Sequence, residues 1–181
     1  MSTLDFNEEL VIEGCKKNNR RSQELLYTHF AKKMYAICLG YAGNRPFAKD
    51  ILQDSFIKVF KNIKDFKKDG SLEGWIRRII TNTAIDYLRK AKRENIFIEP
   101  ENEIFYDENP NLALEKIAFN ELMEQVDRLP QGARLVFNMH ALDGYTHKEI
   151  AKELDITEGT SKSQFNRARK LLMNFIANIN I

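Results

Sequence analysis

Cysteine and histidine are scarce in this sequence, and their positions exclude several common kinds of site. The two cysteines, Cys15 and Cys38, are far apart and form no CxxC pair, so we expect reduced thiols and no disulfide framework or zinc site. The three histidines, His29, His140 and His147, belong to no HExxH motif. A glycine-rich phosphate loop and a GxSxG nucleophile motif are also missing. We therefore expect no catalytic residues, no metal and no cofactor, and an enzyme is the least favoured class of function.

Long hydrophobic runs are missing too. No apolar stretch approaches the roughly 20 residues that a membrane-spanning helix needs. Residues 1–10 carry three acidic side chains and no basic one, which differs from the basic and then apolar plan of a signal peptide. We therefore expect a cytoplasmic protein with no direct membrane insertion.

Apolar residues at helical spacing are abundant. The 43% hydrophobic and 10% aromatic content is too high for a disordered chain. Apolar residues recur three and four positions apart almost throughout, and no convincing alternating strand pattern interrupts them. The sequence therefore predicts an all-α fold with helices at about 6–18, 22–42, 47–65, 71–92, 112–128, 131–142, 147–154 and 158–176.

Charge is distributed unevenly, although the formal net charge is only +2. Residues 77–93 hold six basic side chains and one acid, Asp86, which gives a local charge of +5. Residues 94–111 hold six acids and no base, and residues 162–170 hold four bases and no acid. Two basic patches on either side of an acidic strip suggest a protein that holds a polyanion at two places.

The acidic stretch also has the composition of a linker. Residues 94–111 contain Pro100 and Pro110 and only a few apolar interruptions. We therefore expect two small helical domains, residues 1–93 and residues 112–181, joined by this acidic linker. Its apolar residues fit either a linker that packs on its own domains or one that docks on a partner.

The predicted helix 71–92 has two different faces. Ser71 follows Gly70 and is a good N-cap. One face carries an apolar stripe that includes Trp75, so we expect this ring to be a core residue more than a stacking platform for bases. A helix of this length spans about 33 Å, which is enough to bury one face and offer the other. The offered face is polar and mostly basic: Arg77, Arg78, Asn82, Asp86 and Arg89.

The clearest local signal lies at residues 145–160. Thr146 and Glu149 have the spacing of a capping box, which predicts the start of a short helix. Asp155 lies in the following turn, and Thr157 caps a second helix. Two helices joined by so short a turn form a helix-turn-helix, whose second helix enters the major groove of DNA. The outer face of that helix offers groups that pair with base edges or phosphates: Thr160, Lys162, Ser163, Asn166, Arg167 and Lys170.

A basic outer face alone does not identify a DNA-binding helix, because such faces are often merely solvated. The capped first helix, the tight turn and the basic second helix together favour DNA binding. A helix-turn-helix regulator with an N-terminal sensing domain stays open as an alternative. It explains the C-terminal half equally well but leaves the basic helix 71–92 and the acidic linker unexplained.

Several stretches match the pattern of a known family. Residues 48–60 read AKDILQDSFIKVF, and residues 66–93 include Trp75, Asn82 and the run IDYLRK. Both are similar to sigma region 2, with its patterns AEDLVQETFLRVW and FxxWLxRIAxNxxIDxLRK. The C-terminal half is similar to sigma region 4 at residues 129–130, 134–137, 144–151 and 158–172. In this order and spacing, the chain resembles the extracytoplasmic-function sigma factors of the sigma-70 superfamily over nearly its whole length.

The resemblance implies a non-enzymatic protein that binds bacterial RNA polymerase core and promoter DNA and directs transcription initiation. It implies that the clamp helices of the polymerase's largest subunit bind the helix that carries Asp50, Gln53 and Asp54. It implies that the C-terminal recognition helix reads the −35 element as duplex. Many relatives are held by a membrane-bound anti-sigma factor, so such a partner is expected too.

The resemblance also implies how the −10 element is read. The family binds it as single-stranded DNA and flips a base into a pocket made by the loop before the fourth helix. In this chain that loop is 66–74. The implied −10 contacts from the loop and the helix are Lys67, Lys68, Ser71, Arg77, Arg78, Asn82 and Asp86.

Four positions depart from the family's pattern. Lys49 stands where an acid is usual, which weakens the implied polymerase contact slightly. Asp155 stands where glycine is frequent, and the turn should survive because aspartate tolerates positive φ. Ser161 and Gln164 replace a usual valine and a frequent arginine. We expect these last two to alter which −35 sequence is read.

Overall fold

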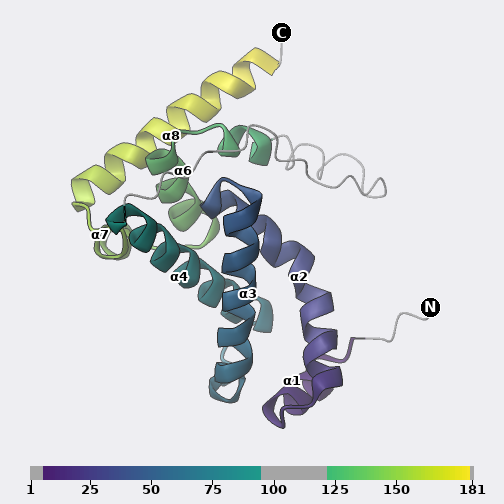
Figure 1. The fold of residues 1–181 in the computed structure, drawn as a ribbon. Helices are drawn as coiled ribbons and strands as arrows, with labels where there is room; N and C mark the ends of the chain where they lie inside the picture. Colours follow the sequence, from purple (N-terminus) through teal and green to yellow (C-terminus); the bar gives the residue numbers. More distant parts are fainter. Residues whose placement is uncertain (1–5, 95–121, 180–181) are drawn as a thin grey trace. The chain divides into compact units, whose positions relative to one another are not determined.

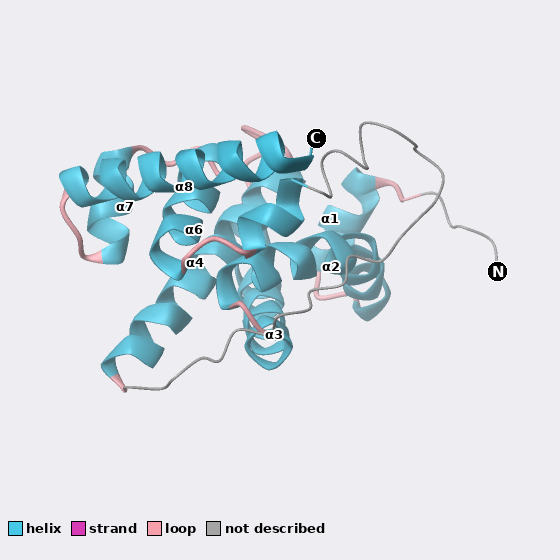
Figure 2. Cartoon of the chain, turned by 90° about the horizontal axis from the view of Figure 1, so that it is seen from above, coloured by secondary structure: helices cyan, strands magenta, loops and turns pink. Residues whose placement is uncertain are grey.

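The computed structural model describes residues 6–94 and 122–179. Within those two ranges every regular element is a helix, which confirms the predicted all-α fold (Figures 1 and 2). The chain divides into two compact units, Met1–Lys90 and Ala91–Ile181. None of the helices in the described part is long and apolar enough to cross a membrane.

Two predicted segments fall largely outside the described ranges. The predicted linker at 94–111 is described only at Glu94. The predicted helix 112–128 is described only from residue 122 onward, and there residues 122–127 are helical.

Short polar caps set the helix boundaries of the first unit. Asn7, Asn19 and Asn44 each accept a hydrogen bond from the backbone N–H three residues on, at 3.0–3.1 Å. Gly43, with φ +76°, ends the second helix in the left-handed conformation. Because Asn19 is a cap, that helix begins two residues before its predicted start. The elements are α1 (Glu8–Lys16), α2 (Arg20–Ala42), α3 (Arg45–Asn62), η1 (Ile63–Asp65) and α4 (Leu72–Arg93).

The core of the first unit is built around α2, which packs against both α1 and α3 (Figure 1). Gly14 permits the close approach of α1, since a Cβ at this position would overlap the side chain of Ser22. The apolar side chains that α2, α3 and α4 turn inward are almost inaccessible: Leu26, Met34, Cys38, Ile51, Val59, Leu72, Ile76 and Ile80. This burial leaves the opposite faces of the same helices to solvent.

Both cysteines are part of this core. Cys15 and Cys38 are buried free thiols, as expected from their spacing. Burial raises the pKa of Cys15 to about 11 and that of Cys38 to about 12. Neither side chain therefore has the thiolate character of a nucleophile or a metal ligand.

The second unit packs its helices around α8. A compact apolar cluster of Val126, Leu129, Ala133, Ala168 and Leu172 joins residues 122–127, α6 and α8. The segment predicted as one helix at 131–142 is two elements, because the backbone changes to a π-helical turn at Asn138. The elements are α6 (Gln131–Phe137), the π-helical η2 (Asn138–Leu142), α7 (His147–Leu154) and α8 (Glu158–Ile179).

We expect Gly14→Ala to lower the free energy of unfolding by about 1–3 kcal/mol, because the new Cβ overpacks the contact between α1 and α2. This loss outweighs the roughly 1 kcal/mol by which alanine is favoured over glycine inside a helix. Gly70→Ala is the matched control, since nothing lies within 4 Å of a Cβ at Gly70. Chemical denaturation measures both variants, and equal stability of the two would contradict the close contact.

Candidate nucleic-acid interface

Three caps build the helix-turn-helix of the second unit, as predicted. The Thr146 backbone N–H donates to Glu149 Oε2 at 2.8 Å, and the Glu149 N–H donates to Thr146 Oγ1 at 3.2 Å. These two bonds form the capping box that starts α7. Asp155 ends α7 in the left-handed conformation, with φ +53°. Thr157 then accepts the Thr160 N–H at 3.0 Å and so caps α8.

The outer face of α8 carries all six residues that were predicted to contact the −35 element, and all six are exposed. Two of them also hold the start of the helix. The Thr160 hydroxyl lies 2.9 Å from the Thr157 hydroxyl, and Ser163 Oγ donates to the Thr160 carbonyl at 2.8 Å. The longer side chains of this face, Lys162, Asn166, Arg167 and Lys170, are therefore the ones that extend furthest into solvent.

Ser161 and Gln164, two of the positions that depart from the family's pattern, do not lie on the outer face of α8. Ser161 is completely buried. Gln164 turns toward α6, and its Cδ lies 3.6 Å from where a Cβ on Gly132 would be. Both residues belong to the packing between helices, because they lie on the inner side of α8 with Ala168.

The outer face of α4 is a second polar surface. Exposed residues recur every four positions, at Arg78, Asn82, Asp86 and Lys90, while Ile76, Ile80 and Ala84 on the other side are fully buried. Asp86 lies among bases: its carboxylate is 3.7 Å from Lys58 Nζ and 3.9 Å from Arg89 Nη1. Arg77, also predicted to contact DNA, is only half-buried.

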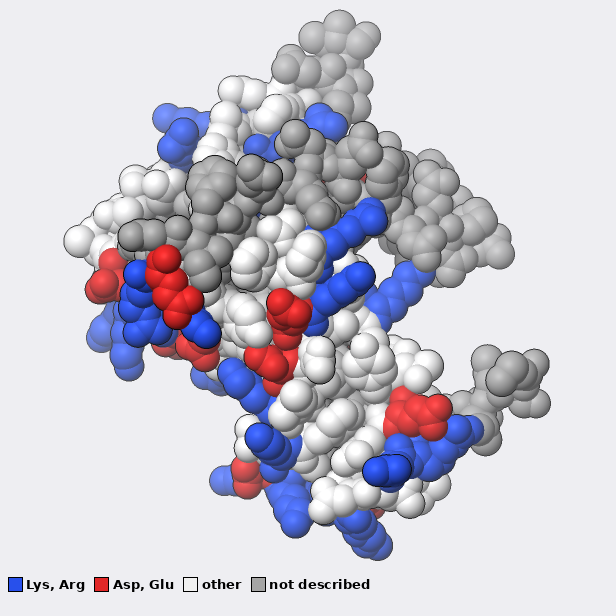
Figure 3. All heavy atoms as spheres, viewed as in Figure 1, with Lys and Arg blue, Asp and Glu red and all other residues white. Residues whose placement is uncertain are grey.

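The loop between η1 and α4 holds the remaining predicted −10 residues. Lys67 and Lys68 are both exposed there. Figure 3 shows Lys and Arg atoms gathered over the lower end of the first unit. Lys68 adopts φ +61°, and its Nζ donates to Glu9 Oε1 at 2.9 Å, which ties the loop to α1. Ser71 Oγ accepts the Gly74 N–H at 3.1 Å and so starts α4, as predicted.

Trp75 lies at the edge of this loop. Its side chain is half-buried, and its ring centroid is 5.5 Å from that of the buried Phe66. The expected core position is therefore only partly correct, because one side of the indole packs inward and the rest of it meets solvent beside the loop.

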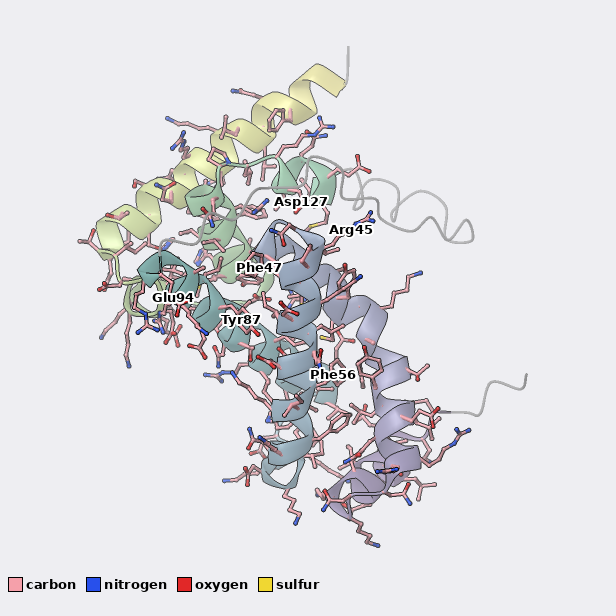
Figure 4. The ribbon with its side chains drawn as sticks, viewed as in Figure 1. Arg45, Phe47, Phe56, Tyr87, Glu94 and Asp127 are labelled. Carbon is pink, nitrogen blue, oxygen red and sulfur yellow. The ribbon has the colours of Figure 1, made fainter. Side chains whose placement is uncertain are left out.

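The residues predicted to bind polymerase lie on α3, but not in equivalent settings. Asp50 and Gln53 are exposed, whereas Asp54 is half-buried and accepts a 2.7 Å hydrogen bond from Tyr87 Oη. Figure 4 shows Tyr87 on α4 beside α3. Burial, the bond to Asp54 and the nearby charge of Asp50 raise the pKa of Tyr87 to about 12. The phenol is therefore protonated at neutral pH and joins α3 to α4.

Sequence patterns gave no sign of an aromatic cluster at the base of α8. His140 from η2 and His147 from α7 stack with ring centroids 4.3 Å apart, and both rings contact Phe165. Histidines without a motif are usually structural, and their separation in sequence hid this contact. Within the described residues, no group of three or more His, Cys, Asp or Glu side chains is arranged to hold a metal ion.

Comparisons with known proteins agree with this geometry. The profile of Sigma-70 region 2 matches residues 26–94, and that of Sigma-70, region 4 matches residues 119–172. The first match contains α4, and the second contains the helix-turn-helix and the cluster around it.

Curated relatives match over most of the chain. The ECF RNA polymerase sigma-E factor of Haemophilus influenzae is 26% identical over 94% of this chain and 96% of its own length. That of Escherichia coli K12 is 29% identical over 93% and 94%. The sigma factor SigE of Mycolicibacterium smegmatis is 31% identical over 85% of this chain and 61% of its own length.

Two solved structures share the fold. The sigma factor RpoE of Bartonella quintana, in complex with the anti-sigma factor NepR, superposes with a TM-score of 0.54 at 19% identity, over 85% of this chain and 96% of that one. CnrH, in complex with the cytosolic domain of CnrY, gives 0.52 at 17% identity, over 94% and 97%. With both sigma regions matched in order and full-length relatives named alike, this chain belongs to the extracytoplasmic-function sigma factors of the sigma-70 family, which direct transcription initiation by RNA polymerase.

Proposed function

We propose that this sigma factor binds the polymerase core through α3 and promoter DNA through two separate helix faces. The proposed division is residues 1–93 for the core and the −10 element, 94–111 as an acidic linker, and 112–181 for the −35 element. The observation that carries the proposal is that α4 and α8 have the same two-faced arrangement of side chains. Each is a long helix with a buried apolar face and an exposed, mostly basic one.

The outer face of α8 fits duplex DNA. Lys162, Asn166 and Lys170 follow one another at four-residue spacing, so they project along one line, with Arg167 beside them. Arginine and lysine pair with guanine edges, asparagine pairs with adenine, and all of them bind phosphates. The start of α8 also carries the partial positive charge of a helix N-terminus, which favours a nearby phosphate.

The outer face of α4 and the loop before it fit melted DNA. Arg78, Asn82 and Lys90 provide a polar track, and the loop adds two lysines at its exposed side. Trp75 supplies a half-exposed ring at the junction between them. A single strand needs such a basic path and a flat apolar surface for its bases.

The exposed side of α3 is the proposed polymerase contact, through Asp50, Gln53 and Asp54. Asp54 offers the polymerase its second carboxylate oxygen, because the first is bonded to Tyr87. Within the part of the chain that the structure describes, no group of His, Cys, Asp or Glu side chains is arranged to hold a metal ion, and both cysteines are buried. We propose that the protein acts in the cytoplasm, without a catalytic activity of its own.

An anti-sigma factor is a further proposed partner, because both solved relatives were captured with one or with a cytosolic domain of another protein. A helix-turn-helix regulator with a sensing domain is not favoured, since the sigma region 2 match covers residues 26–94, where that domain would lie.

Transcription with purified components tests the proposal. We expect polymerase core plus this protein to start transcription at defined promoters with no other sigma factor, and sequencing the 5′ ends of the transcripts identifies those promoters. Core alone is the control. A protein that works only when a housekeeping sigma factor is added would be a regulator and would contradict the proposal.

We expect Lys162→Ala and Arg167→Ala each to weaken binding to the −35 duplex of a promoter so identified. The loss is about 1–3 kcal/mol where the side chain reads a base. Lys17→Ala removes the same charge from an exposed position in the first unit and serves as the control. Fluorescence anisotropy measures the affinities. Unchanged binding for both α8 variants would remove the recognition-helix assignment.

We expect Asn82→Ala to impair promoter opening while it leaves −35 duplex binding intact, because Asn82 lies on α4 and not on α8. Permanganate footprinting measures strand opening, and anisotropy measures duplex binding. Equal loss in the two assays would argue against separate roles for the two units.

We expect Asp54→Lys to weaken binding to the polymerase core and Tyr87→Phe to leave it nearly unchanged. Tyr87→Phe removes the hydrogen bond but keeps the carboxylate, so it should lower the free energy of unfolding by about 1 kcal/mol. Pull-down on core enzyme and chemical denaturation separate the two effects. If both variants lose core binding equally, Asp54 acts only by holding α3 on α4.

A further inference from the structure

The first turns of the recognition helix rest on two imidazole rings. Ser161 and Phe165 lie one turn apart on the inner face of α8. Phe165 packs edge-on against His140 with ring centroids 4.6 Å apart, and its centroid lies 5.8 Å from that of His147. The two imidazoles stack at 4.3 Å with an angle of 19° between their planes. The start of α8 is therefore supported by two stacked imidazole rings.

A hydrogen bond within this cluster joins the two helices of the helix-turn-helix. His147, the first residue of α7, places Nδ1 2.9 Å from Oγ of the completely buried Ser161. A buried hydroxyl is costly without a partner, so this bond fixes where α8 lies on α7. The residue after Ser161 is Lys162, which lies on the outer face of α8 and is a proposed DNA contact.

The second imidazole is held independently. His140 Nδ1 donates to the backbone carbonyl of Tyr145 at 2.8 Å, since a carbonyl oxygen can only accept. This bond ties η2 to the segment that enters α7. It fixes the plane on which His147 stacks, so the His147 ring has little freedom to turn away from Ser161.

We propose that His147 is a positioning residue for DNA recognition, which holds α8 in place through Ser161, and that a second proton on its ring weakens this support by placing a positive charge in a partly buried site beside His140 and Lys162. The inference rests on the proposed function only in that α8 is taken as the helix that reads DNA. The contact itself is a property of the second unit.

The charges around His147 decide the direction of the effect. From η2 it faces His140, and from α8 it faces Lys162 and Glu158. Burial, then His140 and Lys162, lower the pKa of His147, and Glu158 opposes them. The unfolded chain therefore takes up this proton more readily than the folded one. The contribution of neutral His147 to the free energy of unfolding is complete above the ordinary histidine pKa of about 6.5, and it is lost as the pH falls below that value.

Amide hydrogen exchange on the full chain, compared at about pH 7.5 and about pH 5.5, tests the proposal without DNA. Protection factors correct for the intrinsic pH dependence of exchange. In the natural sequence we expect protection of α7 and α8 amides to fall several-fold at the lower pH, while α2 and α3 amides keep theirs. An NMR titration should place the His147 midpoint below that of an exposed histidine.

Three variants isolate the bond. Ser161→Ala should lower α8 protection at both pH values, because it leaves His147 Nδ1 without its partner. His147→Phe keeps a stacked ring but removes the titration, and the double variant with Ser161→Ala should restore protection and make it independent of pH. His29→Gln is the control, since His29 is exposed and stacks on Phe6 in the first unit.

A wild-type pH response that survives His147→Phe would overturn the proposal, and so would a response that His29→Gln abolishes. Should His147→Phe fail to fold, Ser161→Ala and the titration of His147 still decide. The readouts do not involve nucleic acid. A chain that shows this response but fails to bind its −35 duplex would therefore overturn the proposed function and leave the positioning contact standing.

Discussion

The burial of one face of a long helix is the constraint on which the rest of this structure depends. A helix of twenty or so residues that carries several like charges on one side has little stability of its own in water. In α4 the buried side is aliphatic, with Ile76, Ile80 and Ala84 at four-residue spacing. In α8 it changes along the helix, from a hydroxyl and an aromatic ring near the start to Ala168 and Leu172 further on. The inner faces hold the helices rigid, and rigidity is what makes the outer faces usable for recognition.

The two helices differ in how that burial is achieved. The buried side of α4 is mainly aliphatic, and its hydrogen bond to α3 comes from the phenol of Tyr87, whose pKa is raised to about 12. The start of α8 contacts the rings of His140 and His147, and burial and the neighbouring charges lower the pKa of His147. The buried sides of the two helices therefore differ in chemistry: that of α4 is mainly aliphatic, whereas the start of α8 packs against two histidine rings.

Elements that depend on short-range signals were predictable from the sequence. The capping box at Thr146 and Glu149 and the cap at Thr157 involve residues three positions apart, so their geometry follows from spacing alone. The amphipathic stripe of α4 followed from periodicity. The turn at Asp155 was correctly expected to survive without glycine.

Contacts between distant residues were not predictable in the same way. Nothing local reveals that Tyr87 bonds to Asp54, 33 residues earlier, or that His147 bonds to Ser161 across the turn. Ser161 and Gln164 are polar like the exposed residues beside them, and sequence alone did not show that both pack against the neighbouring helices. The π-helical turn at Asn138 likewise has no signature in composition. A polar residue that packs between two helices cannot be told from an exposed one by sequence alone, because the position of the partner helix is not known.

The hydrogen bond between Tyr87 and Asp54 has a mechanical consequence. It joins α3, whose exposed side carries Asp50 and Gln53, to α4, whose exposed side is mostly basic. The phenol of Tyr87 stays protonated across the neutral pH range. The distance between the exposed side of α3 and the exposed side of α4 is therefore fixed within the free protein. Any molecule that shifts α3 would therefore shift the outer face of α4 with it.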